Sequence, residues 1–128
     1  MSYTFSKIMK MPFNSAIEKV TLSLKAEGFG VLTDIDVQAT MKAKINQDMN
    51  GYRILGACNP ALAYQAIQAE PRIGSMLPCN VVVRQLDGES VEISIIDPVA
   101  SMMAIKNEKL GAIATEVQAK LKKVGESL

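Results

Sequence analysis

Apolar and polar residues alternate in several short stretches of this chain, and helical repeats of apolar residues lie between those stretches. Near the N-terminus, Tyr3, Phe5 and Met9 alternate with mostly polar residues, and this period of two predicts a strand. Two short apolar stretches, residues 29–33 and 52–57, also have the length and composition of strands. The pattern therefore predicts three separate strands in the first half of the chain.

The clearest element is a hairpin in the second half of the chain. Residues 80–86 and 89–96 flank the pair Asp87-Gly88, and a turn dipeptide between two alternating stretches is the strongest short-range signal for a β-hairpin. In the second of these strands, the residues expected to face the core are Val91, Ile93 and Ile95.

Helical spacing of apolar residues predicts the first helix. Ile17, Val20 and Leu24 recur at this spacing, Asn14 can cap the start, and Gly28 is placed to end the helix. We therefore expect an amphipathic helix between the first two strands.

Capping residues predict the starts of the remaining helices. Three of them precede helices: Asp36, Asn59 and Asn107. A fourth, Asp97, starts a short segment that ends at Ile105. Asn59 and Asp97 are each followed by proline, which suits the first helical turn. The apolar stripe after Asp36 is narrow, with Val37, Met41 and Ile45. The last helix has a longer stripe: Leu110, Ile113, Ala114, Val117, Leu121 and Val124.

The predicted order is β-α-β-α-β-α-β-β-α. A hairpin beside alternating strands and helices favours an α+β fold with a single mixed or antiparallel sheet and amphipathic helices packed on it. The chain has 128 residues, a common length for one domain. We therefore expect a single domain over residues 1–128.

Charge and apolar segments exclude several functions. Fourteen basic residues face thirteen acidic ones, without a clustered basic stripe, and there are only six aromatic residues, so nucleic-acid binding is disfavoured. No apolar stretch approaches the ~20 residues that span a bilayer, and the first residues lack the apolar core of a signal peptide. We expect a cytoplasmic protein with no membrane partner, in which cysteines are reduced.

Histidine is absent from the sequence. Its absence removes catalytic triads, Cys-His nucleophile pairs and every histidine-ligated metal site. Chemistry in this protein must therefore use cysteine, carboxylate, tyrosine, lysine or backbone groups.

Cys58 is the first candidate for such chemistry. It directly precedes Asn59-Pro60, where a strand gives way to a helix. The positive end of a helix favours a thiolate, so we expect its pKa to lie below the ~8.5 of an ordinary thiol. Gly56 would allow a backbone or ligand to approach closely. The alternative is that Cys58 is a small buried residue at a strand end.

Cys79-Asn80 repeats the Cys-Asn dipeptide at the start of the next strand. If the intervening helix were a full crossover, the two strands would be parallel and the cysteines far apart. Residues 71–78 are long enough to return the chain, and we favour this arrangement, which brings Cys79 near Cys58. Asp97 is expected to cap a helix, with general-base catalysis as the alternative.

Two neighbouring thiols allow several kinds of chemistry. A reversible disulfide, a persulfide or a thiolate metal site are all available, and haem is another candidate. Cys58 and Cys79 alone fall short of the four ligands of zinc, which would need carboxylates or a second subunit. Soft Cu(I) could add Met76, although the eight methionines spread along the chain are more often core filler.

Four segments together carry a family resemblance: residues 27–33 (EGFGVLT), 52–60 (YRILGACNP), 77–83 (LPCNVVV) and 97–98 (DP). In these segments the chain resembles the DUF302 family of small bacterial and archaeal proteins, whose function is unknown. The resemblance implies a compact α+β domain that forms a homodimer. It also places Cys58-Asn59-Pro60 and Cys79-Asn80 on the signature positions of the family.

Three functions remain open. The first is a thiol-based binding or redox module that holds a metal, haem or sulfur species near Cys58 and Cys79, or another small ligand. The second is a small cysteine-dependent enzyme. The third is a structural or regulatory homodimer in which both cysteines serve only in packing.

Overall fold

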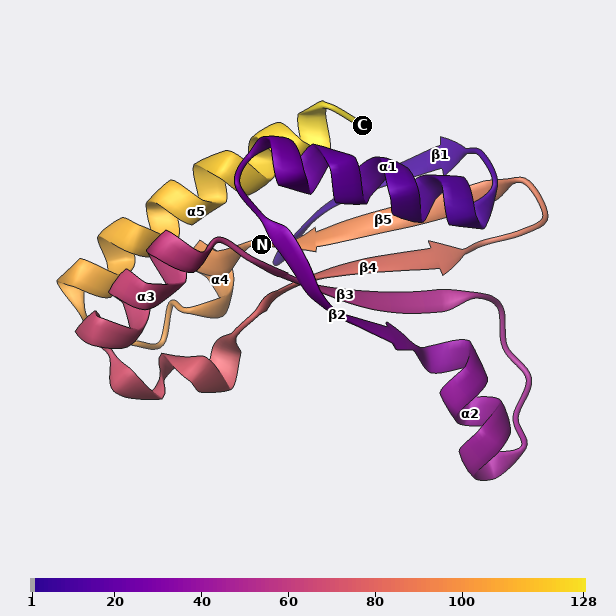
Figure 1. Ribbon diagram of the computed structural model, residues 1–128, viewed down its shortest axis with the longest axis horizontal. Helices are drawn as coiled ribbons and strands as arrows, with labels where there is room; N and C mark the ends of the chain where they lie inside the picture. Colours follow the sequence, from indigo (N-terminus) through magenta and orange to yellow (C-terminus); the bar gives the residue numbers. More distant parts are fainter. Residues whose placement is uncertain (1) are drawn as a thin grey trace.

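The computed structural model describes residues 2–128, which form one five-stranded sheet with helices (Figure 1). The strands are β1 (Thr4–Lys10), β2 (Gly30–Asp36), β3 (Tyr52–Cys58), β4 (Cys79–Gln85) and β5 (Ser90–Ile96). The helices are α1 (Phe13–Ala26), α2 (Val37–Ile45), α3 (Pro60–Ala69), α4 (Pro98–Ser101) and α5 (Glu108–Glu126), with a short 3₁₀ helix η1 (Pro71–Met76).

The sheet has the order β1-β5-β4-β3-β2, and all neighbouring strands are antiparallel. This arrangement confirms the predicted α+β class and selects the antiparallel alternative. Helices α1 and α5 lie side by side over one face of the sheet, whereas α2 projects away from it (Figure 1). The face opposite α1 and α5 is called the open face below.

The main core lies between the sheet and the helices α1 and α5. Its largest fully buried side chains come from alternate positions of the strands and from the helical stripes: Val20, Leu24, Leu55, Val81, Val83, Val91, Ile93, Ile95, Leu121 and Val124. The alternation predicted for the last strand is thus confirmed, since Val91, Ile93 and Ile95 are buried.

The caps largely follow the sequence signals. The side chain of Asp36 accepts a hydrogen bond from the Ala39 amide at 2.9 Å. Asn107 likewise accepts from the Leu110 amide at 3.2 Å. The cap predicted for the first helix is wrong: α1 already begins at Phe13, with Pro12 at the N-cap position.

The connection between β3 and β4 determines where the two cysteines lie. After α3, the helix η1 carries the chain back, and β4 runs antiparallel to β3 with Cys79 opposite Ala57. The end of β3 and the start of β4 therefore share one edge of the sheet. Cys58 and Cys79 lie at this edge, as the shorter path through residues 71–78 predicted.

Gly56 allows the chain to pack closely at this edge. A Cβ atom at Gly56 would overlap the Thr33 hydroxyl and lie 2.6 Å from Cγ of Pro78. Pro78 follows a cis peptide bond and directly precedes Cys79. The close approach predicted at Gly56 is thus made by Thr33 and Pro78 of the same chain.

Among residues 2–128, no helix is long and apolar enough to cross a membrane.

We predict that Gly56→Ala destabilises the fold by about 1–3 kcal/mol, the usual cost of inserting a methyl group into a well-packed site. Urea unfolding followed by circular dichroism measures this change. Gly30→Ala is the matched control, because a Cβ atom at this strand glycine has no atom within 4 Å. A loss of stability no larger than that of Gly30→Ala would contradict the role of Gly56.

Candidate functional site

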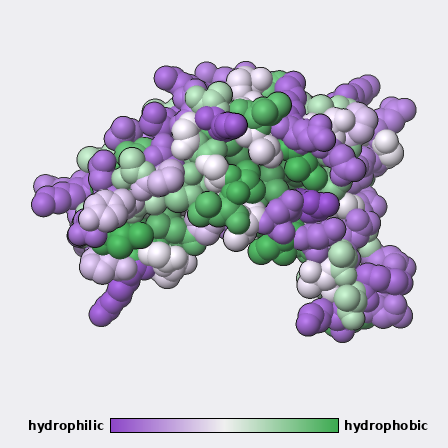
Figure 2. Space-filling view, viewed as in Figure 1, coloured by the Kyte–Doolittle hydropathy of each residue, from purple (hydrophilic) through white to green (hydrophobic). Residues whose placement is uncertain are grey.

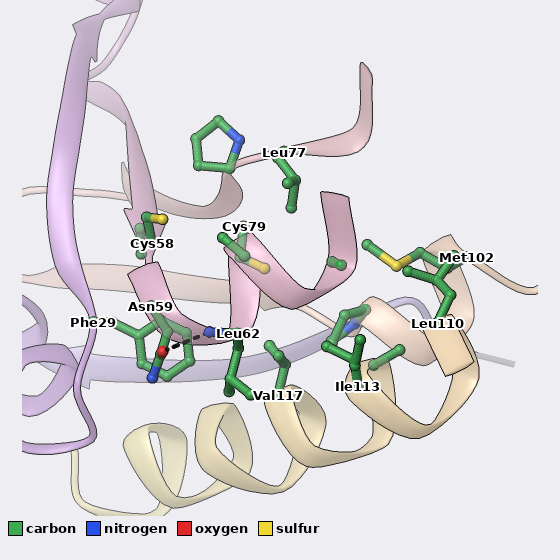
Figure 3. A pocket seen from close by; sticks show the side chains of 16 residues that line it. Phe29, Cys58, Asn59, Leu62, Leu77, Cys79, Met102, Leu110, Ile113 and Val117 are labelled. Atoms are coloured by element: carbon green, nitrogen blue, oxygen red, sulfur yellow. Dashed lines mark hydrogen bonds between the residues drawn. The ribbon is translucent and has the colours of Figure 1, made fainter. Parts of the chain in front are cut away.

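Cys58 and Cys79 line the same pocket, which we call the thiol pocket. Its other walls come from β3, α3, α4, α5 and the segments before β2 and β4, and include Phe29, Leu62, Leu77, Met102, Leu110 and Val117. Cys58 is half-buried and Cys79 is 9% exposed. Figure 3 shows Cys58 at one end of the pocket and Cys79 further inside, toward Leu62.

The thiol pocket lies where two apolar clusters meet. Cys79, Leu62 and Val117 belong to the main core, whereas Leu110 belongs to a smaller cluster beyond the end of the sheet. The pocket encloses about 40 Å³ and its lining is almost wholly apolar. Drug-sized ligands need roughly 300–1,000 Å³. In this conformation the pocket suits a guest of only a few atoms.

Both thiols are neutral at neutral pH. Burial raises the pKa of Cys58 above its ordinary value, so the lowered pKa expected from the start of α3 is wrong. Burial, with a smaller contribution from nearby Cys58, raises the pKa of Cys79 to about 11. Desolvation of the thiol disfavours the charged thiolate. Neither cysteine has the low pKa that marks a reactive nucleophile.

Asn59 and Asn80 have different environments despite the repeated Cys-Asn dipeptide. The side chain of Asn59 caps α3 by accepting a hydrogen bond from the Leu62 amide at 3.2 Å, as predicted, and Pro60 occupies the first turn. Asn80 is exposed and lies opposite Gly56 on the open face, away from the thiol pocket. The two dipeptides therefore do not form a symmetric site.

Asp97 acts as a helix cap, the first of its two predicted roles. Its carboxylate is buried and accepts hydrogen bonds from the amides of Val99 (3.0 Å) and Ala100 (3.4 Å). Gln118 of α5 also donates to both carboxylate oxygens, at 3.0 and 3.2 Å. Asp97 thus ties α4 to α5. Gln118 had no signal in the sequence, because it is one polar residue on the side of a long helix.

The methionine that lines the thiol pocket is Met102, and not the Met76 considered from the sequence. Met76, the methionine considered as a soft ligand, lines a neighbouring hollow and is absent from the lining of the thiol pocket. Met102 lines the pocket, on the side away from Cys58 (Figure 3). Within the part of the chain that the structure describes, no group of three or more cysteine or acidic side chains is placed to hold a metal ion.

The sequence matches the family described as "Domain of unknown function DUF302" over residues 5–128. The chain belongs to this family. The resemblance drawn from the sequence is therefore confirmed. A search of curated proteins found no match.

The DUF302 chain is also similar to a solved structure, the crystal structure of an uncharacterized conserved DUF302 protein from Bacillus stearothermophilus. The two share 27% sequence identity, and the TM-score is 0.90. The similarity covers 99% of this chain and 98% of the Bacillus chain. The complete fold described above, and not only its sheet, is therefore shared within the family.

We predict that alkylation of Cys79 is slow at neutral pH and accelerates until the pH reaches about 11, because the thiolate is the nucleophile and its pKa is raised to about 11. Mass spectrometry after timed iodoacetamide treatment from pH 7 to 11.5 gives the rate at each cysteine. The same thiols in urea are the control and should titrate near ~8.5. A rate at Cys79 that levels off below pH 9 in the folded protein contradicts the prediction.

Proposed function

We propose that this protein is a binding module in which Cys58 and Cys79 hold a soft metal ion such as Cu(I). The observation that supports the proposal is that two free thiols from neighbouring strands line one small apolar pocket. Thiolate ligands favour Cu(I) over harder ions.

The size of the pocket separates the candidate guests. A volume of about 40 Å³ accommodates an ion but falls well short of a site for a drug-sized group. A haem is larger still. Size therefore supports an ion or a single sulfur atom over haem.

The protonation of the thiols separates the remaining candidates. Disulfide exchange and persulfide chemistry begin with attack by a thiolate, and both thiols have raised pKa values. A metal ion instead displaces the thiol protons as it binds. Raised pKa values therefore disfavour redox chemistry, sulfur transfer and a cysteine-dependent enzyme, whereas a metal ion can still bind by releasing the thiol protons, with an affinity that rises with pH.

Packing is the second candidate role for the cysteines, and the burial of Cys79 supports it. Cys79 is part of the main core, where free cysteine often serves as a small apolar residue. Under this alternative the protein binds no metal, and Cys79→Ala would only lower stability.

The compartment and assembly of the protein are part of the proposal. Both cysteines are free thiols in the structure, and a dithiol site for a soft ion requires a reducing compartment such as the cytoplasm. We also propose that the chain forms a homodimer, as the family resemblance implies.

We predict that the reduced protein binds one Cu(I) per chain when titrated anaerobically against a coloured Cu(I) chelator. Cys58→Ser and Cys79→Ser should each weaken binding by at least about 100-fold, the upper end of the loss caused by residues that merely orient metal ligands. Circular dichroism checks that each variant is folded.

Ala63→Ser is the matched control, because it adds a hydroxyl to the same pocket and leaves both thiols in place. This variant should bind Cu(I) within a few-fold of the wild type. Substoichiometric binding by the wild type, or unchanged binding by both cysteine variants, would reject the metal site and favour the packing role.

A further inference from the structure

Helix α2 is an ordered helix that has no buried residue. It spans nine residues, Val37–Ile45, whereas isolated helices shorter than ~12–15 residues are marginal in water, and most helices in proteins depend on packing of an apolar face. Within residues 2–128, α2 is held by its caps and by exposed contacts such as the 3.0 Å ion pair between Lys42 and Asp48. Exposed pairs of this kind contribute at most about 1 kcal/mol.

The apolar side chains of α2 continue onto the sheet. Val37, Met41 and Ile45 form a stripe along the helix. Ile35 lies directly before α2, opposite Ile54 in the pairing of β2 and β3. We call these five residues the α2 surface. Ile45 is 60% exposed and Ile35 is 49% exposed, so much of this apolar surface lacks a partner.

There is room for a second helix beside α2. Figure 2 shows the molecule hollowed on its lower side, between α2 and the part of the chain formed by α3 and η1, with hydrophobic atoms at the centre of the hollow. A partner helix placed there would cover α2 and the neighbouring part of the open face together.

The charges around α2 favour a copy of the same segment. Its start carries Asp34 and Asp36, which share one cation, Arg53, at 2.9 and 3.5 Å. The last turn carries Lys42, which pairs with Asp48, and Lys44. An antiparallel copy of α2 would bring the basic end of each helix to the acidic start of the other. A two-fold axis repeats this contact and closes the assembly.

We propose that the α2 surface is a dimer interface, in which α2 packs antiparallel against α2 of a second copy of this chain. The apolar stripe supplies most of the binding free energy, since the charges also suit the dipole of their own helix. The inference deepens the proposed homodimer by locating its interface, and it is independent of metal binding at the thiols.

We predict that the full-length protein is a dimer at micromolar concentration and that Ile45→Glu raises the dissociation constant of the dimer at least 100-fold. A buried carboxylate without a partner opposes association, whereas the exposed position keeps the monomer fold intact. Sedimentation velocity over a concentration series measures the constant. Leu22→Glu on α1 is the matched control, because Leu22 is 68% exposed and outside the α2 surface. It should stay within about twofold of the wild type.

Amide hydrogen exchange tests the same contact locally. Amides of residues 40–45 should be protected in the wild-type dimer and lose protection in Ile45→Glu, while α1 retains its protection in both. A monomeric wild type would overturn both the homodimer and its interface. A wild-type dimer that survives Ile45→Glu, or that Leu22→Glu disrupts equally, would overturn the interface alone. Neither outcome bears on Cu(I) binding.

Discussion

The pairing of Ala57 with Cys79 across β3 and β4 determines the position of both thiols. Side chains alternate across a strand, so a shift of one residue would turn Cys79 from the core to the open face. Gly56 constrains this pairing, because only a residue without a Cβ atom fits between Thr33 and Pro78. The thiol pocket thus depends on backbone packing one residue before the pair, on the opposite face of the sheet.

Burial raises the pKa of Cys58, although the residue directly precedes a helix start. The start of α3 favours a thiolate, but the side chain of Asn59 already satisfies one of the free amides there by capping the helix. The surroundings of Cys58 are apolar, and they favour the neutral thiol. A cysteine beside a helix start is therefore not by itself an activated nucleophile. The apolar surroundings thus oppose a reaction that begins with a thiolate at rest.

Features set by residues close together in the sequence were predictable, whereas features set by tertiary packing were not. The caps at Asp36, Asn59 and Asn107 and the hairpin after Cys79 follow from short motifs. Asn14 was misleading because helical geometry was already established at Phe13, with Pro12 at the cap position. The two Cys-Asn dipeptides look alike in sequence, yet one asparagine caps a helix and the other faces outward, because only the fold assigns the faces. Met102 entered the pocket from a distant segment, without any local signal.

The α2 surface and the thiol pocket lie at opposite ends of β3. Asp36, directly before α2, pairs with Arg53, whereas Cys58 pairs with Gly30 at the other end. Arg53 and Cys58 are five steps apart along β3, which corresponds to about 17 Å. A second chain packed on α2 would therefore contact the end of β3 that is distant from Cys58. Changes this far apart are usually additive, so each surface can evolve without the other. Coupling that passes along β3 would cross Gly56, where a Cβ atom would overlap Thr33 and Pro78.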